Sequence, residues 1–208
     1  DCPMAILRGN QCIALKFFRG SPKELVDFID RTLDEYDVPV ENFAFDATGI
    51  GYYLKSYTRG FPVTANRKPI QEIDANGNPV TVELYFNMRS QRLGKTKVMF
   101  EKGELSMAID KNMVIPYGKK GRTRKLLDVL FDEINVFIST TRNKKIYYRS
   151  KDEYKAKFHS SPNLMDTLCL FSVFRLDARP KKQPEPEIED DAYYGLYNTP
   201  TLNGYYIP

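Results

Sequence analysis

One segment near the end of the chain constrains the fold more than any other. Residues 164–174 read Leu-Met-Asp-Thr-Leu-Cys-Leu-Phe-Ser-Val-Phe, and at helical spacing they leave almost no polar face. Such a helix is stable only when it is buried, and Ser161-Pro162 predicts where it begins. Asp166 is the only charged residue in it. Because an unpaired buried carboxylate is strongly unfavourable, its charge must be compensated by a nearby Lys or Arg, by the helix N-terminus, or by a bound cation.

The beginning of the chain predicts alternating strands and helices. Two apolar stretches flank the turn formers Gly9 and Asn10, which is typical of a β-hairpin. Ser21 and Pro22 then supply the N-cap and first helical position of an amphipathic helix. The predicted elements are strands at 2–7 and 12–18, a helix from 22 to about 36, a strand at 42–46 and a helix at about 50–57. This order is typical of mixed α/β folds.

The rest of the chain predicts further short elements and a tail. The turn-rich residues 74–79 indicate an exposed hairpin tip. We then expect a helix at 87–94, extended chain from 107 to 116, a helix at 126–134 and a strand at 143–151. From residue 178 the sequence is rich in Pro, acid and Tyr without an apolar period, which is typical of a flexible tail. We therefore divide the chain into one domain, 1–177, and a tail, 178–208, that contributes little to the core.

The composition excludes several kinds of chemistry. The chain has three cysteines, which is an odd number, and they show no CxxC spacing, so neither a disulfide framework nor a zinc site is indicated. We expect all three to be buried thiols. His159 is the single histidine, which argues against a His-based metal site or a Ser-His-Asp triad. Carboxylates are the remaining candidates for catalysis.

Nucleotide binding and membrane insertion are also not indicated. The turn Gly49-Ile50-Gly51 has Leu54 where a dinucleotide-binding loop has its third glycine, and no GKT or GKS follows a Gly-rich stretch. We therefore expect no bound nucleotide. There is no run of about 18 apolar residues and no signal-peptide pattern. These features predict a soluble, intracellular protein without a membrane partner.

Asp46 is the second candidate acid. It ends a short apolar strand at the edge where α/β sheets place their functional sites. The alternative is a local role, in which Asp46 forms an Asx turn or caps the helix that follows. Two buried acids that face each other repel unless metal ions lie between them. Because oxygen-only ligation selects hard cations, the implied ions are Mg²⁺ or Mn²⁺.

Three motifs in order resemble a known family. They are FAFDATGIG at 43–51, FNMRSQ at 86–91, and KDEYK at 151–155 followed by HSSPNLMDTL at 159–168. This combination resembles the nuclease domain of phage terminase large subunits over roughly residues 1–177. Asn163 replaces the usual first acid of the last motif and Thr167 replaces its alanine. Neither departure removes the metal-ligand position at Asp166.

The resemblance implies a fold and an activity. The fold is α/β and RNase H-like, with a mixed central sheet of about five strands, helices on both faces and an inserted β-hairpin between Thr64 and Phe86. The activity is metal-dependent endonuclease cleavage of concatemeric double-stranded DNA in a viral DNA-packaging motor. Asp46 and Asp166, together with an upstream Asp, would hold two Mg²⁺ or Mn²⁺ ions. The family's ATPase domain is absent from this chain.

The position of the family's first metal ligand leaves two alternatives at the N-terminus of this chain. The family's first metal Asp lies on the opening strand, several residues before a second acid that is not a ligand. Spacing to the turn at Arg19-Gly20 aligns Asp1 with that second acid, so we expect the first ligand upstream of this chain. The alternative is that Asp1 is itself the ligand.

The resemblance also implies partners. Double-stranded DNA, the portal and the small terminase subunit are the expected partners, in the cytoplasm of the bacterial host. The formal charge of +4 suits a polyanion partner. The residues expected to contact phosphates are Lys119, Lys120, Arg122, Arg124, Lys125, Lys144, Lys145 and Arg149; the alternative for each is a solvated surface charge. Two other functions stay open: a non-catalytic DNA-binding or portal-docking module on the same fold, and an RNase H-like resolvase or transposase.

Overall fold

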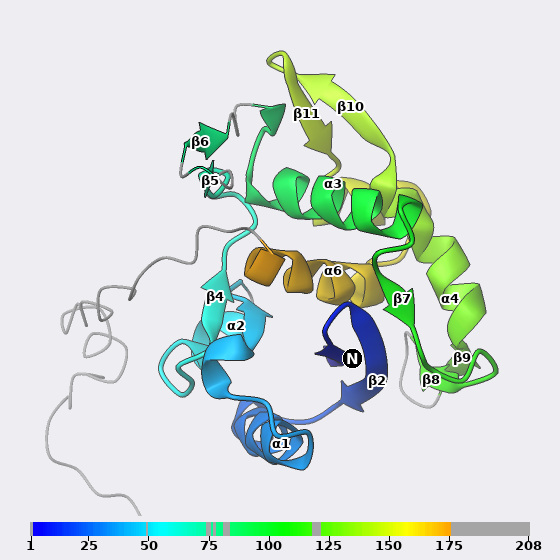
Figure 1. Ribbon diagram of the computed structural model, residues 1–208. Helices are drawn as coiled ribbons and strands as arrows, with labels where there is room; N and C mark the ends of the chain where they lie inside the picture. Colours follow the sequence, from blue (N-terminus) through cyan, green and yellow to red (C-terminus); the bar gives the residue numbers. More distant parts are fainter. Residues whose placement is uncertain are drawn as a thin grey trace, which may run out of the picture. The chain divides into compact units, whose positions relative to one another are not determined.

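A β-hairpin opens the chain in the computed structural model (Figure 1). Strands β1 (Cys2–Arg8) and β2 (Gln11–Phe18) pair antiparallel, with one register shift between Ile6 and Leu7. Gly9 in the connecting turn has φ +58°, a left-handed conformation that glycine adopts without strain. The short strand β7 (Ser106–Met107) adds to β2 in parallel. The hairpin predicted from the sequence is confirmed.

The hairpin β1–β2 packs against side chains on both of its faces. Ala5, Leu7, Leu15 and Phe17 join one apolar cluster, which contains residues of the helices α3 (Met88–Glu101), α4 (Leu126–Glu133), α5 (Lys151–Phe158) and α6 (Asn163–Leu170). Cys2, Met4 and Phe18 alternate with these residues along the strands and join a second cluster with the helices α1 (Pro22–Glu35) and α2 (Ile50–Leu54). This alternation follows from the two-residue period of a β-strand. Residues of helices therefore pack on both faces of the β1–β2 hairpin.

Helix α1 (Pro22–Glu35) begins and ends close to where the sequence predicts. Ser21 and Glu24 form a capping box, in which each side chain accepts a hydrogen bond from the backbone N–H of the other residue. Leu25, Ile29 and Leu33 form its buried face. The helix is amphipathic, as the sequence pattern indicates.

The segment after α1 carries the first candidate acid. A 3-10 turn (Val40–Asn42) leads into β3 (Ala44–Asp46), which pairs in parallel with β4 (Phe61–Val63). Helix α2 (Ile50–Leu54) connects them and ends before Tyr57, so the predicted helix is too long. The chain leaves the helix through backbone hydrogen bonds that Tyr57 and Thr58 donate to the carbonyl of Leu54.

The inserted hairpin and helix α3 follow. Strands β5 (Glu72–Ile73) and β6 (Pro79–Val80) pair antiparallel, and the buried Gln91 side chain both donates to and accepts from the backbone of Ile70. Helix α3 (Met88–Glu101) is longer than predicted. Gly94 lies inside this helix, where the Tyr85 ring leaves no room for a side chain: a Cβ at Gly94 would stand 2.5 Å from ring atom Cε1.

The following segment differs from the sequence prediction in its boundaries. A turn at residues 110–112 divides the predicted extended stretch into β7 and β8 (Val114–Pro116), and β8 pairs with β9 (Thr123–Lys125). Helix α4 (Leu126–Glu133) and a 3-10 turn (Ile134–Phe137) follow. Strands β10 (Ser139–Arg142) and β11 (Lys145–Tyr148) form a hairpin. Helix α5 (Lys151–Phe158), with a capping box from Ser150 and Glu153, was not predicted.

Helix α6 (Asn163–Leu170) is the buried helix that the sequence predicts, and a 3-10 turn (Phe171–Arg175) continues it. Leu164, Met165, Leu168 and Cys169 are buried. The helix packs against α3, α4, β1 and β3, and Figure 1 shows it between α3 and the β1–β2 hairpin. It therefore contacts β3, which ends at Asp46, and β1 at the start of the described chain.

The structure describes residues 2–48, 50–73, 76, 78–80, 84–117 and 122–175. The chain divides into two units, 1–178 and 179–208, and every helix and strand above lies in the first. The predicted tail, Asp74, Ala75 and Gly77 of the hairpin tip, Asp1, Lys119 and Lys120 lie outside the described residues. Within the described part the strands pair as five small sheets, and a single central sheet is not among them. No helix in that part is long and apolar enough to cross a membrane.

The three cysteines are free thiols, and Cys12 and Cys169 are buried. Burial raises the pKa of Cys12 to about 11 and that of Cys169 to about 12, which keeps both protonated and unreactive. Cys2 is only partly buried, so the prediction is wrong for this residue. It lies at the edge of the cluster under α1, at the first described position of β1.

Candidate active site

Asp166 lies in the first turn of α6, with a side chain only 12% exposed. Its Oδ1 accepts a charge-assisted hydrogen bond from Nη1 of Arg89 on α3. Its Oδ2 is buried and accepts no hydrogen bond within the described residues. Nζ of Lys151, which is partly exposed at the start of α5, lies 3.9 Å from Oδ2. The predicted alternative of a nearby Arg is therefore realised for one carboxylate oxygen and leaves the other without a hydrogen bond.

Arg89 is held by three segments of the chain. Its backbone N–H donates to Ala65 O at 3.0 Å and its Nε donates to Arg149 O at 3.1 Å. The residue is 4% exposed, and its Nη2 is buried without a hydrogen-bond partner in the described structure. The guanidinium group therefore has little freedom to leave Asp166.

Asp46 is partly buried at the end of β3. Its Oδ1 accepts hydrogen bonds from the backbone N–H of Thr48 at 3.1 Å and from Thr48 Oγ1 at 2.7 Å. This is the Asx turn named above as the local alternative. Among the described residues Asp46 forms no ion pair, so this acid is not neutralised by a Lys or Arg of its own.

Arg92, one turn after Arg89 on α3, links the two acids electrostatically. It is 4% exposed, and its Nε and Nη1 are buried without hydrogen-bond partners in the described structure. Burial lowers the pKa of Arg92, and the negative charges of Asp166 and, more weakly, Asp46 oppose that effect. Both acids therefore lie within electrostatic range of one buried guanidinium group, and α6 packs on β3.

The donor atoms fit a hard cation in part. The buried Oδ2 of Asp166 is a carboxylate oxygen without a hydrogen bond, and oxygen donors are those that Mg²⁺ and Mn²⁺ prefer. However, the described residues contain no cluster of three or more acidic, His or Cys side chains that could hold a metal by itself. Asp46 and Asp166 could supply two ligands, and a further acid would have to come from outside the described part of the chain.

Glu133 is a third acid near the site, and the sequence did not indicate it. It is 1% exposed at the end of α4, and its Oε2 accepts the backbone N–H of Met165 at 2.9 Å. The N-cap of α6 is Pro162, which has no capping side chain, so Glu133 supplies the cap from another helix, where Ser161-Pro162 was predicted to do so. Burial raises the pKa of Glu133 to about 7, the Met165 N–H lowers it, and the Asp166 charge raises it.

We expect Glu133 to make the stability of the domain depend on pH. Its pKa is near 4.5 when unfolded and about 7 when folded, so folding favours the protonated acid. The stabilisation is complete below the unfolded pKa and is lost as the pH rises through the folded pKa. The difference corresponds to on the order of 3 kcal/mol. Thermal melts from about pH 5 to about pH 8 should show wild type losing stability relative to Glu133→Gln.

A variant at an exposed acid is the control for this measurement. Glu41→Gln changes an exposed acid and should keep the wild-type pH profile. Parallel profiles for wild type and Glu133→Gln would contradict a raised pKa at Glu133.

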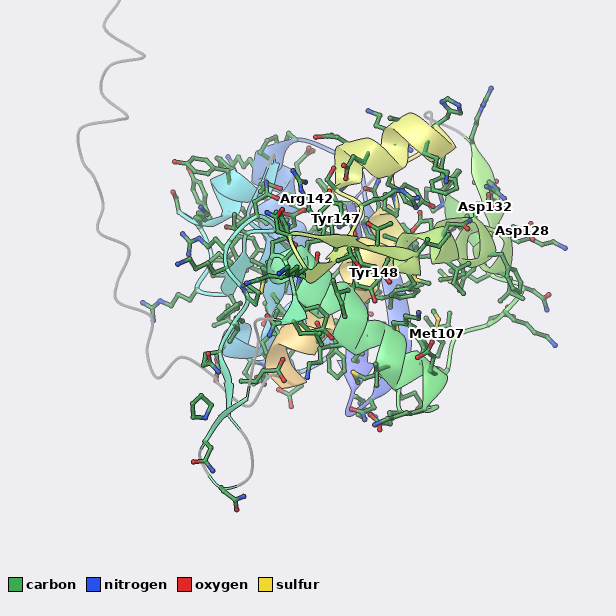
Figure 2. All side chains as sticks on the ribbon, turned by 90° about the horizontal axis from the view of Figure 1, so that it is seen from above. Met107, Asp128, Asp132, Arg142, Tyr147 and Tyr148 are labelled. Atoms are coloured by element: carbon green, nitrogen blue, oxygen red, sulfur yellow. The ribbon has the colours of Figure 1, made fainter. Side chains whose placement is uncertain are left out.

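The predicted phosphate contacts that the structure describes lie in more than one place. Arg122, Arg124 and Lys125 lie at β9, whereas Lys144 and Lys145 lie at the turn of the β10–β11 hairpin, on another side in Figure 1. Figure 2 likewise places Asp132, the ion-pair partner of Arg124, away from Arg142 of the hairpin. Lys119 and Lys120 lie outside the described residues.

Two of these residues have other contacts. Arg124 forms an ion pair with Asp132 at 2.5 Å and lies over the Tyr117 ring at 5.0 Å. Arg149 is only partly exposed, its Nη1 is buried without a hydrogen-bond partner, and its carbonyl accepts from Arg89. Arg149 therefore lies beside Arg89, the partner of Asp166, and is only partly open to solvent.

Comparison with known proteins identifies the fold. No protein-family model matches the sequence, and no curated protein matches it. Solved structures do match, and the fold they share with this chain is that of the nuclease domain of a phage terminase large subunit. The fold resemblance predicted from the sequence motifs is confirmed.

The matching structures include three of the nuclease domain of the large terminase subunit gp2 of bacterial virus Sf6. Each is 20% identical and covers 78% of this chain, with TM-scores of 0.51, 0.53 and 0.53. The matches cover 77%, 79% and 77% of those chains. One is the nuclease domain itself; the other two are of a mutant with manganese, one of them also with β-thujaplicinol.

Proposed function

We propose that this chain is the metal-dependent endonuclease domain of a viral DNA-packaging motor and that it cuts concatemeric double-stranded DNA. The observation that carries the proposal is the buried Asp166 Oδ2, which accepts no hydrogen bond within the described structure of a fold shared with terminase nucleases. A buried carboxylate oxygen in that state is unfavourable unless a cation binds it. The manganese in two of the similar structures supports a divalent metal for this chain also.

Asp46 and Asp166 would hold Mg²⁺ or Mn²⁺, with a third acid from an upstream strand or from Asp1. In a two-metal site the ions activate a water molecule and stabilise the leaving oxygen of the phosphodiester. The protein's own part is to fix the carboxylates: Thr48 orients Asp46, and Arg89 orients Asp166. Lys151 is partly exposed at the same place and is available to attract a phosphate.

We further propose that β1, β2, β7, β3 and β4 correspond to the five-stranded central sheet of RNase H-like proteins. Helix α6 packs against both β1 and β3, which supports a common layer for the two small sheets that contain them. In that arrangement the end of β3 and the first turn of α6 meet at one edge of the layer. This is the edge where α/β folds place their sites.

The partners and the compartment follow from the same proposal. Double-stranded DNA is the substrate, contacted at its phosphates by the basic residues of β9 and of the β10–β11 hairpin. The portal and the small terminase subunit are the protein partners, and the bacterial host's cytoplasm is the compartment. We propose no nucleotide for this chain, since its sequence has neither a P-loop nor a dinucleotide-binding loop.

Metal-dependent cleavage of plasmid DNA tests the proposal. A longer chain that includes the strand upstream of Asp1 should nick or linearise plasmid with Mg²⁺ or Mn²⁺ and with little sequence preference. Ca²⁺ should not support cutting, because its larger and looser coordination misplaces the attacking water. Gel analysis of plasmid forms gives the result. Intact DNA binding without cutting under any divalent metal would favour the non-catalytic DNA-binding or docking module.

A further inference from the structure

The contact with Arg89 occupies only one of the two carboxylate oxygens of Asp166. Oδ1 is occupied by Nη1 of Arg89, while Oδ2 is buried and accepts no hydrogen bond in the described structure. The two side chains are 5% and 12% exposed, so water competes little for this ion pair. Arg89 is also tied to Arg149 O through Nε, which fixes the plane of the guanidinium group. Asp166 therefore offers one oxygen to a ligand and not two.

A carboxylate with one available oxygen does not serve all divalent cations equally. Ca²⁺ takes six to eight oxygen ligands in flexible geometry, and carboxylates often bind it through both oxygens. Mg²⁺ requires near-octahedral geometry and accepts single carboxylate oxygens. Blocking Oδ1 therefore removes a ligand that the larger ion can use and costs the smaller ion little.

We propose that Arg89 sets the metal selectivity of the site, because its hold on Asp166 Oδ1 restricts Asp166 to single-oxygen coordination and so disfavours Ca²⁺ relative to Mn²⁺ and Mg²⁺. The inference rests on the proposed nuclease function and deepens it. Arg89 acts through Asp166 and is a positioning residue.

The test compares the affinities of Mn²⁺ and Ca²⁺ for the longer chain that includes the strand upstream of Asp1, because that strand is proposed to supply a further acid to the site. Free Mn²⁺ is counted by its EPR signal during titration, and Ca²⁺ affinity is obtained by displacement of bound Mn²⁺. In Arg89→Gln the side-chain amide nitrogen stands where Nε stood, so the contact with Arg149 O can remain while the contact with Asp166 is lost. The Ca²⁺ affinity divided by the Mn²⁺ affinity should rise on the order of tenfold, the effect of one contact to a charged group.

The ratio of the Ca²⁺ and Mn²⁺ affinities separates a change in metal selectivity from the general effect of losing a positive charge. Loss of the Arg89 charge strengthens binding of both divalent ions, so it cancels in the ratio of their affinities. Lys16→Met is the matched control, because it removes one positive charge and the ion pair with Glu35 at 2.8 Å. Its ratio should equal that of wild type. Arg89→Met removes both Arg89 side-chain contacts and carries the same expectation as Arg89→Gln, so the test does not depend on one variant folding.

The outcomes distinguish this inference from the proposed function. If wild type binds Mn²⁺ but the ratio of Ca²⁺ to Mn²⁺ affinity in the Arg89 variants lies within about twofold of wild type, the inference is overturned. The nuclease proposal would still stand. Wild type that binds no Mn²⁺ would overturn both. A raised ratio in the Arg89 variants and an unchanged ratio in Lys16→Met would support the inference.

Discussion

Asp166→Asn and Asp46→Asn should each abolish DNA cleavage by the longer chain and leave DNA binding intact. Asn keeps the shape of the side chain and an Oδ1 that can still accept from Arg89 or Thr48, so only the negative charge is lost. In the proposed site that charge holds the metal for the chemical step and does not bind the DNA backbone. We expect the rate of plasmid cleavage to fall roughly a thousandfold, the scale of lost electrostatic stabilisation in other enzymes.

Two control variants match the contacts of these acids. Asp110→Asn changes an exposed Asx turn, in which Asn112 N donates to Asp110 Oδ1 at 2.9 Å, and is the counterpart of Asp46→Asn. Glu35→Gln removes a carboxylate that is paired with Lys16 and is the counterpart of Asp166→Asn. Both should cut at the wild-type rate. DNA affinity, measured by fluorescence anisotropy, should be equal in all four variants, and full cleavage by Asp166→Asn would remove this residue from the site.

The positions of the two acids were predictable because each depends on local sequence. Asp46 follows a short apolar strand and precedes a Gly-containing turn, and these neighbours fix its place at the strand end. Asp166 is the one charge in an apolar helix, so its burial follows from the helix period. The first hairpin and α1 were predictable for the same reason, since their turn and capping box lie within the elements they define.

The partners of Asp166 were not predictable, because they are distant in the sequence. Arg89 is 77 residues away and Met165, which Glu133 caps, is 32 residues from that acid. Arg89 lies in the FNMRSQ motif, but nothing in the sequence pairs it with Asp166, and Glu133 resembles the surface charges that most helices carry. Only packing of α3 and α4 against α6 buries them. Helix α5 could have been found, because Ser150 and Glu153 have the spacing of a capping box.

We also expect a large loss of stability from a substitution at Gly51, where α2 packs closely on the end of β3. A Cβ at Gly51 would lie 1.6 Å from the carbonyl oxygen of Asp46 and 2.8 Å from its carbonyl carbon. Both are backbone atoms, so no side chain can move aside to relieve the clash, and either α2 or the end of β3 must shift. Gly51→Ala should therefore lower the free energy of unfolding by about 3 kcal/mol, the upper end for overpacking, as measured by urea denaturation.

The same substitution should also impair the site, because the displaced atoms belong to Asp46. Under conditions where Gly51→Ala remains folded, cleavage by the longer chain should fall, since a displacement near 1 Å at a catalytic group costs about a hundredfold. Gly103→Ala is the matched control: its φ of +69° strains an alanine, but nothing lies within 4 Å of the added Cβ. It should lose about 1 kcal/mol of stability and no activity. If Gly51→Ala proves as stable and as active as Gly103→Ala, the contact between Gly51 and the Asp46 backbone does not position the acid.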